Sequence, residues 1–310
     1  MAQRYRAMVL ASFAGDALAL GAHWIYDTDK LISQLGRVEE FLSPSPDSYH
    51  SGKADGQFTH YGDQTLLLLK TLNRGATFDL EEFGANWRRF MENYDGYMDK
   101  ATTETLANFK EGRDAFNSGS ASTDLGGPAR MAPLLYHFRS DQDLLLSYVR
   151  EQTAMTHNSQ SALLAADLLC RLCWNVLNGA RPAEAVLQLL EDGINDITLE
   201  MRIRNALESG GDSTTAAIKG GGQACGAEQA LPGVVHLITA YEDNLEEALI
   251  ENVMAGGDSA ARGLATGMIL GAHLGMEAIP QRWLREMVSY DTIVSLLDTP
   301  SPAQNATVPL

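Results

Sequence analysis

The segment Ala255–Gly275, AGGDSAARGLATGMILGAHLG, constrains the fold more than any other part of the chain. After two glycines and an aspartate, it runs through about four helical turns of small and apolar residues. A helix with so few side-chain atoms can pack at the centre of a bundle with neighbours close on every side. Asp258 stands where an N-cap or first-turn acid belongs. We expect a buried central helix that holds this acid in one place, either as a plain cap or as part of a site.

Helical periodicity continues over most of the chain, and no run shows the period-two alternation that is typical of a strand. Helices are predicted over Arg4–Leu20, Asp27–Leu35, Gly62–Leu72, from Asp79 onward, and over Met98–Asn117, Ala129–Phe138, Asp141–Met155, Ser159–Asn178, Pro182–Asp192, Asp196–Ser209, Glu228–Tyr241, Leu245–Met254 and Gln281–Leu297. We find no internal repeat and no linker between two cores. The sequence therefore predicts an all-α fold, with one compact multi-helix domain over residues 1–299 and a flexible C-terminal tail, 300–310.

Three segments lack a helical period. Gly36–Tyr61 contains prolines, glycines and many polar residues, and a loop of this length is uncommon in a compact domain and often functional. Gly119–Pro128 and Gly210–Gly226 are rich in glycine, which favours turns near helix starts. These loops are the expected carriers of a site.

Composition excludes several classes of partner. The formal net charge of −17 argues against nucleic acid and anionic membranes, because phosphate contacts require lysine and arginine. No apolar run approaches the roughly 18 residues of a transmembrane helix. Asp16, directly after Gly15, argues against a signal peptide. Cys170 and Cys173 lie in a strongly apolar helical stretch, which favours core packing over redox chemistry. These features predict a cytoplasmic protein, and they leave its oligomeric state open.

Four Gly-Asp pairs lie at or near predicted helix starts: Gly15-Asp16, Gly62-Asp63, Gly211-Asp212 and Gly257-Asp258. As a set, their carboxylates could converge on a hard cation such as Mg²⁺, which prefers oxygen ligands. Gly-Asp is also ordinary turn chemistry, so four unrelated caps explain the same pattern. The residues alone do not decide between these two interpretations.

The turn His23–Asp27 follows the first predicted helix. His23 and Asp27 could act as an acid–base and orienting pair, and Trp24 or Tyr26 could stack on a ring. The alternative is a packed turn with a hydrogen-bonded histidine. Backbone amides at Gly126-Gly127, Gly210–Asp212 and Gly220–Gly222 could face a pyrophosphate, although glycine stretches also form plain turns.

Several ordered blocks of the sequence resemble the ADP-ribosylglycohydrolase family, which includes dinitrogenase-reductase-activating glycohydrolase and the J1-crystallins. They are GDALALGAHWIYD, HYGDQTLLLL, GGPARMAPLLY, TAMTHNSQSALLAADLL, ALPGVVHLI and AGGDSAARGLATGMILGAHLGMEAIPQRW. HWIYD and YGDQ are similar to the J1-crystallin branch. The resemblance implies an all-α fold. In active members it also implies two Mg²⁺ ions that help cleave the bond from ADP-ribose C1″ to a protein side chain or small leaving group.

The resemblance and the residue patterns together give the candidate site residues. Those assigned to ligand binding are Asp16, Gly126, Gly127, Arg130, His157, Asp212 and Arg262, and those assigned to catalysis are Asp63, His23 and Asp27. The family's metal ligands come from a Thr-Asp-Asp motif and from an Asp-x-Asp-Thr motif at the start of the closing helix. The assigned metal ligands are Asp63, Gln64 and Asp258.

These metal motifs are incomplete in this chain. Gly62 stands at the first threonine, Gln64 replaces the second aspartate, and Ala260 and Ala261 replace two ligands of the closing motif. Two divalent cations need several carboxylates to balance their charge and fill their coordination shells. We therefore expect one Mg²⁺ or none.

Arg262 offers a substitute for the missing positive charge. It lies four residues after Asp258, on the same face of the predicted helix. We hypothesise that its guanidinium pairs with Asp258, and with Asp63, in the space that metal fills in active relatives. The alternative is a surface ion pair of little energetic consequence.

Three functions remain open at this point. The first is a divergent hydrolase that cleaves an N- or O-glycosidic bond of ADP-ribose or a related nucleotide sugar, with water activated by one metal or by Asp63. The second is a non-catalytic protein that binds ADP-ribose or a similar nucleotide. The third is a crystallin-like structural protein, for which a strongly acidic surface is also suitable.

Overall fold

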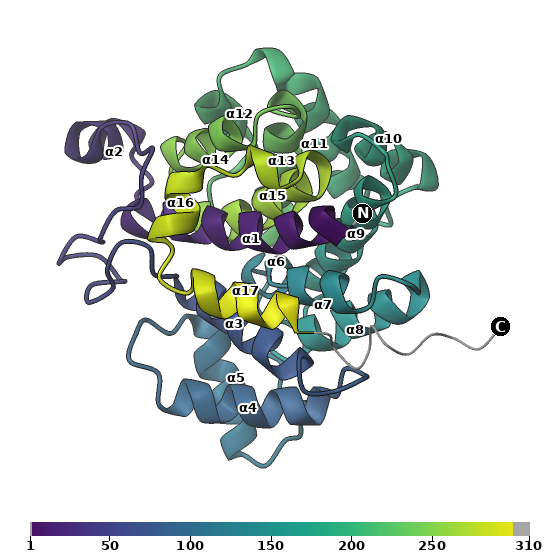
Figure 1. Cartoon of the computed structure of the whole chain (residues 1–310). Helices are drawn as coiled ribbons and strands as arrows, with labels where there is room; N and C mark the ends of the chain where they lie inside the picture. Colours follow the sequence, from purple (N-terminus) through teal and green to yellow (C-terminus); the bar gives the residue numbers. More distant parts are fainter. Residues whose placement is uncertain (1, 300–310) are drawn as a thin grey trace.

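Helices make up nearly all the regular structure in the computed structural model, which describes residues 2–299 (Figure 1). The helices are α1 (Ala2–Ala19), η1 (Leu20–Ala22), α2 (Thr28–Leu35), α3 (His60–Leu72), α4 (Leu80–Glu92), α5 (Lys100–Lys110), α6 (Gly126–Ala129), α7 (Ala132–His137), α8 (Gln142–Ala154), α9 (Gln160–Leu177), α10 (Pro182–Asp192), α11 (Ile197–Glu208), η2 (Ser209–Gly211), α12 (Thr214–Gly221), α13 (Ala227–Ala240), α14 (Leu245–Met254), α15 (Ser259–Leu274), η3 (Met276–Ala278), α16 (Gln281–Glu286) and α17 (Tyr290–Asp298). Within the described residues the backbone forms no strand, only two isolated bridges. The all-α prediction is confirmed, and the predicted tail, 300–310, lies outside the described residues.

The first and fifteenth helices pack against each other along most of their length (Figure 1). Small residues spaced four apart on each helix face one another in antiparallel order: Gly263 with Gly15, Gly267 with Ala11, and Gly271 with Ala7. A Cβ atom at any of these three α15 glycines would press on a backbone carbonyl of α1. Every residue of α15 from Ser259 to Ala272 is buried. The expected thin central helix is therefore present, and its glycines allow the close backbone approach.

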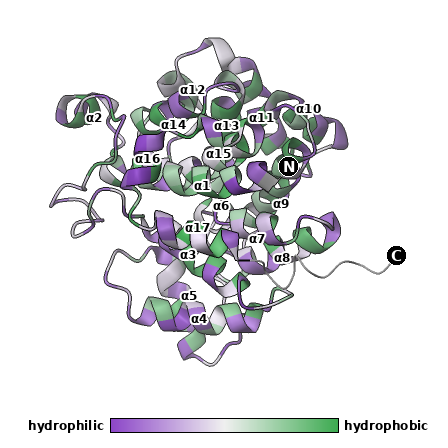
Figure 2. Cartoon of the chain, viewed as in Figure 1, coloured by the Kyte–Doolittle hydropathy of each residue, from purple (hydrophilic) through white to green (hydrophobic). Residues whose placement is uncertain are grey.

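The remaining helices lie on either side of this pair. In Figure 1, α10 to α14 lie above α1, α9 lies at the right-hand end of α1, α3, α4 and α5 lie below, and α17 runs alongside α3. One connected cluster of buried apolar side chains extends from Tyr5 to Leu297. Figure 2 shows hydrophilic and hydrophobic residues alternating around α4, the pattern of an amphipathic surface helix. Among the described helices, none has the length and apolar character needed to cross a membrane.

Side-chain caps begin many of the helices where the sequence predicts them. Asp27 accepts from the backbone N–H groups of Asp29 and Lys30 at the start of α2, and Asp79 accepts from Glu82 N at the start of α4. Such caps satisfy N–H groups that have no partner inside the helix. Local sequence therefore determines these helix starts.

Three predicted boundaries are wrong. Thr214–Gly221, expected in a loop, forms α12, because Ser213 caps it and Ile218 is buried. The helix predicted over Met98–Asn117 is only α5, which ends before Gly112 with its positive φ of 89°. The helix predicted over Gln281–Leu297 divides into α16 and α17, because Val288 N donates to Gly56 O and draws the chain out of the helix.

Candidate active site

A cluster of aromatic and titratable side chains, from fully buried to largely exposed, lies where the loop 36–59 meets the start of α3 and the turn before α15. Trp24 is at its centre and has a φ of +64°, the only positive φ at a non-glycine position among the described residues. Its N–H donates to Gly257 O at 3.0 Å, and Gly257 N donates back to Ile25 O at 2.9 Å. These two hydrogen bonds stabilise the left-handed backbone conformation of Trp24, which residues other than glycine rarely adopt. Backbone strain of this kind concentrates at functional sites.

Aromatic rings surround the indole of Trp24. The ring of His50 stacks on it with centroids 5.6 Å apart, and Tyr97 and Tyr49 meet it edge-on at 5.0 and 5.2 Å. His50 and Tyr49 come from the long loop that the sequence predicts to be functional. Burial lowers the pKa of His50 to about 3, so its ring is neutral at physiological pH.

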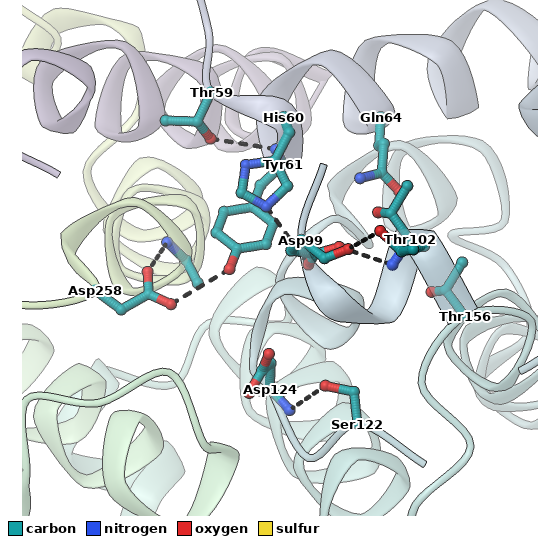
Figure 3. A network of polar contacts seen from close by, with 12 residues as sticks. Thr59, His60, Tyr61, Gln64, Asp99, Thr102, Ser122, Asp124, Thr156 and Asp258 are labelled. Carbon is teal, nitrogen blue, oxygen red and sulfur yellow. Dashed lines mark hydrogen bonds and ion pairs between the residues drawn. The ribbon is translucent and has the colours of Figure 1, made fainter. Parts of the chain in front are cut away.

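Asp258 lies at the N-terminus of α15, and Figure 3 shows its carboxylate directed at the Tyr61 hydroxyl. Its Oδ1 accepts from Ala261 N at 3.2 Å and lies 3.8 Å from His23 Nε2, and its Oδ2 lies 3.4 Å from the Tyr61 hydroxyl. Asp258 and His23 have fully buried side chains. Because His23 Nδ1 accepts from Ala260 N, the neutral ring carries its proton on Nε2, facing the carboxylate.

The protonation behaviour of this pair follows from burial. Burial raises the pKa of Asp258 to about 6, although the charge of Arg262 and the Ala261 N–H oppose the shift. Burial also lowers the pKa of His23 well below its ordinary value, helped by the nearby rings of His50 and His60. Asp258 is thus a carboxyl group that gains a proton near neutral pH beside a neutral imidazole.

A second cluster of titratable groups lies beside Tyr61. Asp99 caps α5 by accepting from Thr102 N at 2.7 Å, and its Oδ2 lies 3.5 Å from His60 Nε2. One ligand atom each from Asp99, Asp124 and His157 lie within 4.8 Å of one another. Figure 3 shows Tyr61 between Asp258 and Asp99, with Asp124 on the opposite side of this space. Asp99, Asp124 and His157 together form a candidate metal site.

Burial affects the two buried members of this cluster differently. It raises the pKa of Asp99, but the contact with His60 outweighs burial, and the pKa lies below its ordinary value. Burial lowers the pKa of His157 to about 4, against the attraction of Asp99. An ionised Asp99 beside a neutral His157 is the combination that a metal cation prefers.

The positions predicted to bind magnesium have other partners. Asp63 Oδ2 accepts from Lys53 Nζ at 2.5 Å and from the Tyr94 hydroxyl at 2.6 Å. Gln64 Oε1 accepts from Trp87 Nε1 and from an Arg130 guanidinium nitrogen, both at 2.7 Å. The cation beside Asp63 is therefore Lys53, not Arg262 as hypothesised.

These residues do not fit a two-magnesium centre. The ammonium group of Lys53 already balances the charge of Asp63, and the amide oxygen of Gln64 already accepts two hydrogen bonds. Ala260 and Ala261 have no side-chain oxygen to contribute. Of the predicted ligands, only Asp258 has no cation within ion-pair distance apart from the His23 ring, and one carboxylate cannot hold two Mg²⁺ ions.

Arg262 is fully buried, so its interpretation as a surface ion pair is wrong. It donates to Asn252 Oδ1 at 3.1 Å and to Gly256 O at 2.6 Å. No ion pair within 4.0 Å joins it to Asp258 or Asp63 in the described part of the chain, although its charge lowers the pKa of Asp258. Arg262 therefore stabilises the turn before α15 through hydrogen bonds, and it affects Asp258 through electrostatics rather than direct contact.

Asp16, assigned to ligand binding, holds the start of α3 instead. It is fully buried and accepts from Thr59 N at 2.8 Å and from Thr59 Oγ1 at 2.6 Å. Burial raises its pKa to about 7, and the two bonds from Thr59 limit the shift. Its role is to connect α1 with the loop that precedes the site.

Gly126 and Gly127 pack against the rings of Tyr61 and His157, and Arg130 donates hydrogen bonds to nearby side chains. A Cβ at Gly126 would overlap the Tyr61 ring, and one at Gly127 would lie 2.6 Å from the His157 ring. Arg130 is buried and donates to Gln64, Gln152 and Thr156. Packing accounts for both glycines, and internal hydrogen bonds account for the arginine.

Asp27 and His23 do not pair. The Asp27 carboxylate caps α2 and is exposed, and no hydrogen bond or ion pair joins the two in the described structure. Both line a cavity of about 330 Å³, together with Trp24, Tyr26 and Tyr49. The predicted pairing of His23 with Asp27 is absent, and His23 instead lies beside Asp258 with its side chain fully buried.

Asp212 is placed elsewhere. It is exposed and lines a separate cavity of about 400 Å³ together with Gly220, Gly221 and His236. None of the lining residues of this cavity belongs to the cluster around Trp24 and Asp258. The four Gly-Asp pairs therefore do not converge on one cation.

Sequence reasoning missed several members of the site. They are Tyr49, His50, Lys53, His60, Tyr61, Tyr97, Asp99 and Asp124. The unusual length of the loop 36–59 signalled three of them, and the HYGDQ block contains two more. Asp99 and Asp124 are single acids at turns, and no spacing in the sequence links them to His157.

Comparisons with known proteins agree with this architecture. The family model ADP-ribosylglycohydrolase matches residues 1–306. An uncharacterized protein of Archaeoglobus fulgidus is 28% identical over 290 residues, covering 92% of this chain and 91% of its own. Crystallin J1A of Tripedalia cystophora is 24% identical over 298 residues, with 91% of each chain covered. ADP-ribosylhydrolase ARH3 of Mus musculus is 23% identical over 335 residues, covering 93% and 88%.

A solved structure described as an ADP-ribosylglycohydrolase-related protein complex superposes on this chain with a TM-score of 0.78. It covers 98% of each chain at 24% sequence identity. At this level of identity the similarity shows the fold, and the chemistry has to be argued from the residues of this chain.

Proposed function

Because the chain belongs to the ADP-ribosylglycohydrolase family, we propose that it binds an ADP-ribose-type nucleotide and hydrolyses the N- or O-glycosidic bond at its terminal ribose without a two-magnesium centre. The observation that carries the proposal is Asp258, a buried carboxyl group with a pKa raised to about 6, held between His23 and Tyr61. A carboxyl group with such a pKa can supply a proton to a leaving group near neutral pH.

The proposed mechanism assigns the general acid to Asp258. Protonation of the leaving-group atom assists cleavage of the bond to the anomeric carbon, whose transition state carries positive charge. Water then attacks the anomeric carbon, and the proton that it loses restores the protonated carboxyl group of Asp258. His23 is a positioning residue, because its Nε2–H faces Asp258 while Nδ1 is fixed by Ala260 N.

The cavity of about 330 Å³ beside His23 suits part of a nucleotide. Trp24, Tyr26 and Tyr49 offer aromatic faces for a base, and Lys30 offers a positive charge for a phosphate. Asp63, earlier assigned as a base, has no role in this mechanism because Lys53 and Tyr94 occupy its Oδ2. We further propose that residues 1–299 act as one domain, since one apolar cluster extends from Tyr5 to Leu297. The cytoplasmic location stays a prediction from composition.

A second candidate is a non-catalytic nucleotide-binding or crystallin-like protein. The Lys53–Asp63 ion pair favours it, because a fixed amine stands where active relatives are expected to place metal. The J1-crystallins among the relatives are consistent with this alternative.

Two measurements separate these functions. Thermal unfolding is followed with and without ADP-ribose, and release of ADP-ribose from N-linked and O-linked ADP-ribosyl peptides is followed with and without added Mg²⁺. The proposal predicts stabilisation by ADP-ribose. It also predicts release that needs no added Mg²⁺ and is lost in Asp258→Asn but kept in the matched control Asp79→Asn, at the exposed N-cap of α4. Binding without release would support the non-catalytic function, and neither effect would support the structural one.

A further inference from the structure

We propose that Asp99, Asp124 and His157 bind one divalent transition-metal ion. The three side chains come from the start of α5, the loop before α6 and the turn before α9, so only the tertiary fold brings them together. This site is separate from the positions that align with the family's magnesium motifs. The inference does not depend on the proposed hydrolysis.

The ligand atoms are already close to bonding separation. They lie within 4.8 Å of one another, whereas a metal with bonds of about 2.0 to 2.2 Å holds its ligand atoms roughly 3 to 4 Å apart. A contraction of about an ångström completes the site, within the reach of side-chain rotation. Asp99 Oδ1 is fixed by Thr102 N, which leaves Oδ2 directed at His60 Nε2, 3.5 Å away.

Buried nitrogen atoms without hydrogen bonds point to a missing partner. Within the described residues, His157 Nε2 has no hydrogen-bond partner, and neither ring nitrogen of His60 forms one. His60 is fully buried and His157 is 3% exposed, so bulk water does not reach these nitrogen atoms. A buried polar atom without a hydrogen-bond partner is rare in proteins. A metal ion bound by the three side chains satisfies His157 Nε2, whereas His60 Nε2 already faces Asp99 Oδ2 at 3.5 Å.

The surroundings of His157 match those of a metal ligand. Its Nδ1 lies 2.8 Å from Thr156 Oγ1, which also accepts from Arg130. In the tautomer protonated at Nδ1, His157 donates to Thr156 and keeps the lone pair of Nε2 free. Histidines that bind metals are commonly oriented in this way by a second hydrogen bond.

The ligand set selects the class of metal. Two carboxylates and one imidazole favour Zn²⁺, Mn²⁺ or Fe²⁺ over Mg²⁺, which binds oxygen and dehydrates reluctantly. Asp99 and Asp124 balance the charge of a divalent ion, and Arg130, the nearby fixed cation, is held away by Gln64, Gln152 and Thr156. Asp124 is half-buried, and its neighbour Thr123 lines a cavity of about 280 Å³.

The test uses the purified full-length protein, first stripped of metal. It is titrated with Zn²⁺, Mn²⁺ and Mg²⁺ by calorimetry, and its metal content after dialysis is measured by mass spectrometry. We expect one Zn²⁺ per chain, bound more tightly than Mg²⁺. His157→Gln and Asp124→Asn should each weaken Zn²⁺ binding at least about tenfold. Asp99→Asn should do the same, although its amide oxygen can still cap α5.

Two matched control variants test whether Zn²⁺ binds at Asp99, Asp124 and His157. Asp63→Asn changes the position that aligns with the family's magnesium motif, and Cys225→Ser removes the thiol near Asp124. Both should bind Zn²⁺ as the unchanged protein does. No stoichiometric Zn²⁺ or Mn²⁺ binding, or equal affinity in His157→Gln and Asp124→Asn, would overturn the proposal.

If the variants fail to fold, a spectroscopic measurement on the unchanged protein still tests the ligand set. The unchanged protein loaded with Co²⁺ should show ligand-field bands of a nitrogen and oxygen site without a thiolate charge-transfer band. A thiolate band would place the metal on Cys225 and overturn the assignment. No nucleotide is present in these experiments, so their result is independent of whether the chain hydrolyses ADP-ribose conjugates.

Discussion

Lys53 Nζ lies 2.5 Å from Asp63 Oδ2, so a side-chain amine neutralises the aspartate that aligns with the first acid of the family's magnesium motif. The two side chains are 15% and 19% exposed, which makes this a largely buried ion pair. The Tyr94 hydroxyl donates to the same oxygen at 2.6 Å. Both contacts therefore fall on the same carboxylate oxygen of Asp63.

Removing the Lys53 amine should lower the free energy of unfolding, and the unpaired Asp63 carboxylate should then bind Mg²⁺. Lys53→Met leaves Asp63 with no positive partner, and losing one member of a buried pair costs about 3 kcal/mol in the free energy of unfolding. Urea denaturation should show this loss, and added Mg²⁺ should restore part of it in the variant but not in the unchanged protein. Lys100→Met, in an exposed pair with Glu104, is the control and should change stability by less than about 0.5 kcal/mol. Equal responses in both variants would contradict the role of Lys53.

Asp16 should make stability fall as pH rises. Its pKa is about 7 in the folded protein and near 4 when unfolded, so between these values the folded state binds more protons. The free energy of unfolding should therefore decrease from pH 4 to pH 7, by at most about 1.4 kcal/mol per pH unit from this group. In Asp16→Asn this contribution disappears, because the amide does not titrate. Urea denaturation at several pH values checks the difference, and parallel pH profiles would count against it.

The contact between α1 and α15 should not tolerate a single added methyl group. In Gly267→Ala the new Cβ overlaps the carbonyl of Ala11, a backbone group that cannot move aside. We expect a loss of about 3 kcal/mol in the free energy of unfolding. Gly220→Ala, at a helical position with open space around it, should be neutral or slightly stabilising. Similar stabilities for the two variants would show that the helices can separate without cost.

Hydrolysis by the proposed mechanism should slow as pH rises through the pKa of Asp258. Because the general acid must be protonated and its pKa is about 6, the turnover rate should fall about tenfold per pH unit well above that value. His23→Gln should shift this profile, since it removes a neighbour of Asp258 without removing the acid. A rate that is independent of pH between 6 and 9 would exclude Asp258 as the acid.

Much of the fold follows from local sequence. Helical periodicity, caps such as Asp27 and Asp79, and the small residues of Ala255–Gly275 placed most helices and identified the central one. These signals are local because a cap or an apolar face is defined by residues within a few turns. Where long-range contacts compete, as at Val288 N and Gly56 O, the local pattern fails.

The site was determined only in part by sequence. His23 and Asp258 were identified, but their pairing required α1 and α15 to meet. Lys53, Asp99 and Asp124 were missed, since each is an ordinary charged residue in a loop or at a turn. Residues far apart in the chain become neighbours only through packing, and burial then shifts their pKa values. The sequence by itself therefore determined the helices and the family, and the tertiary structure decided which charges face one another, because electrostatic interactions depend on distance and desolvation rather than on position along the chain.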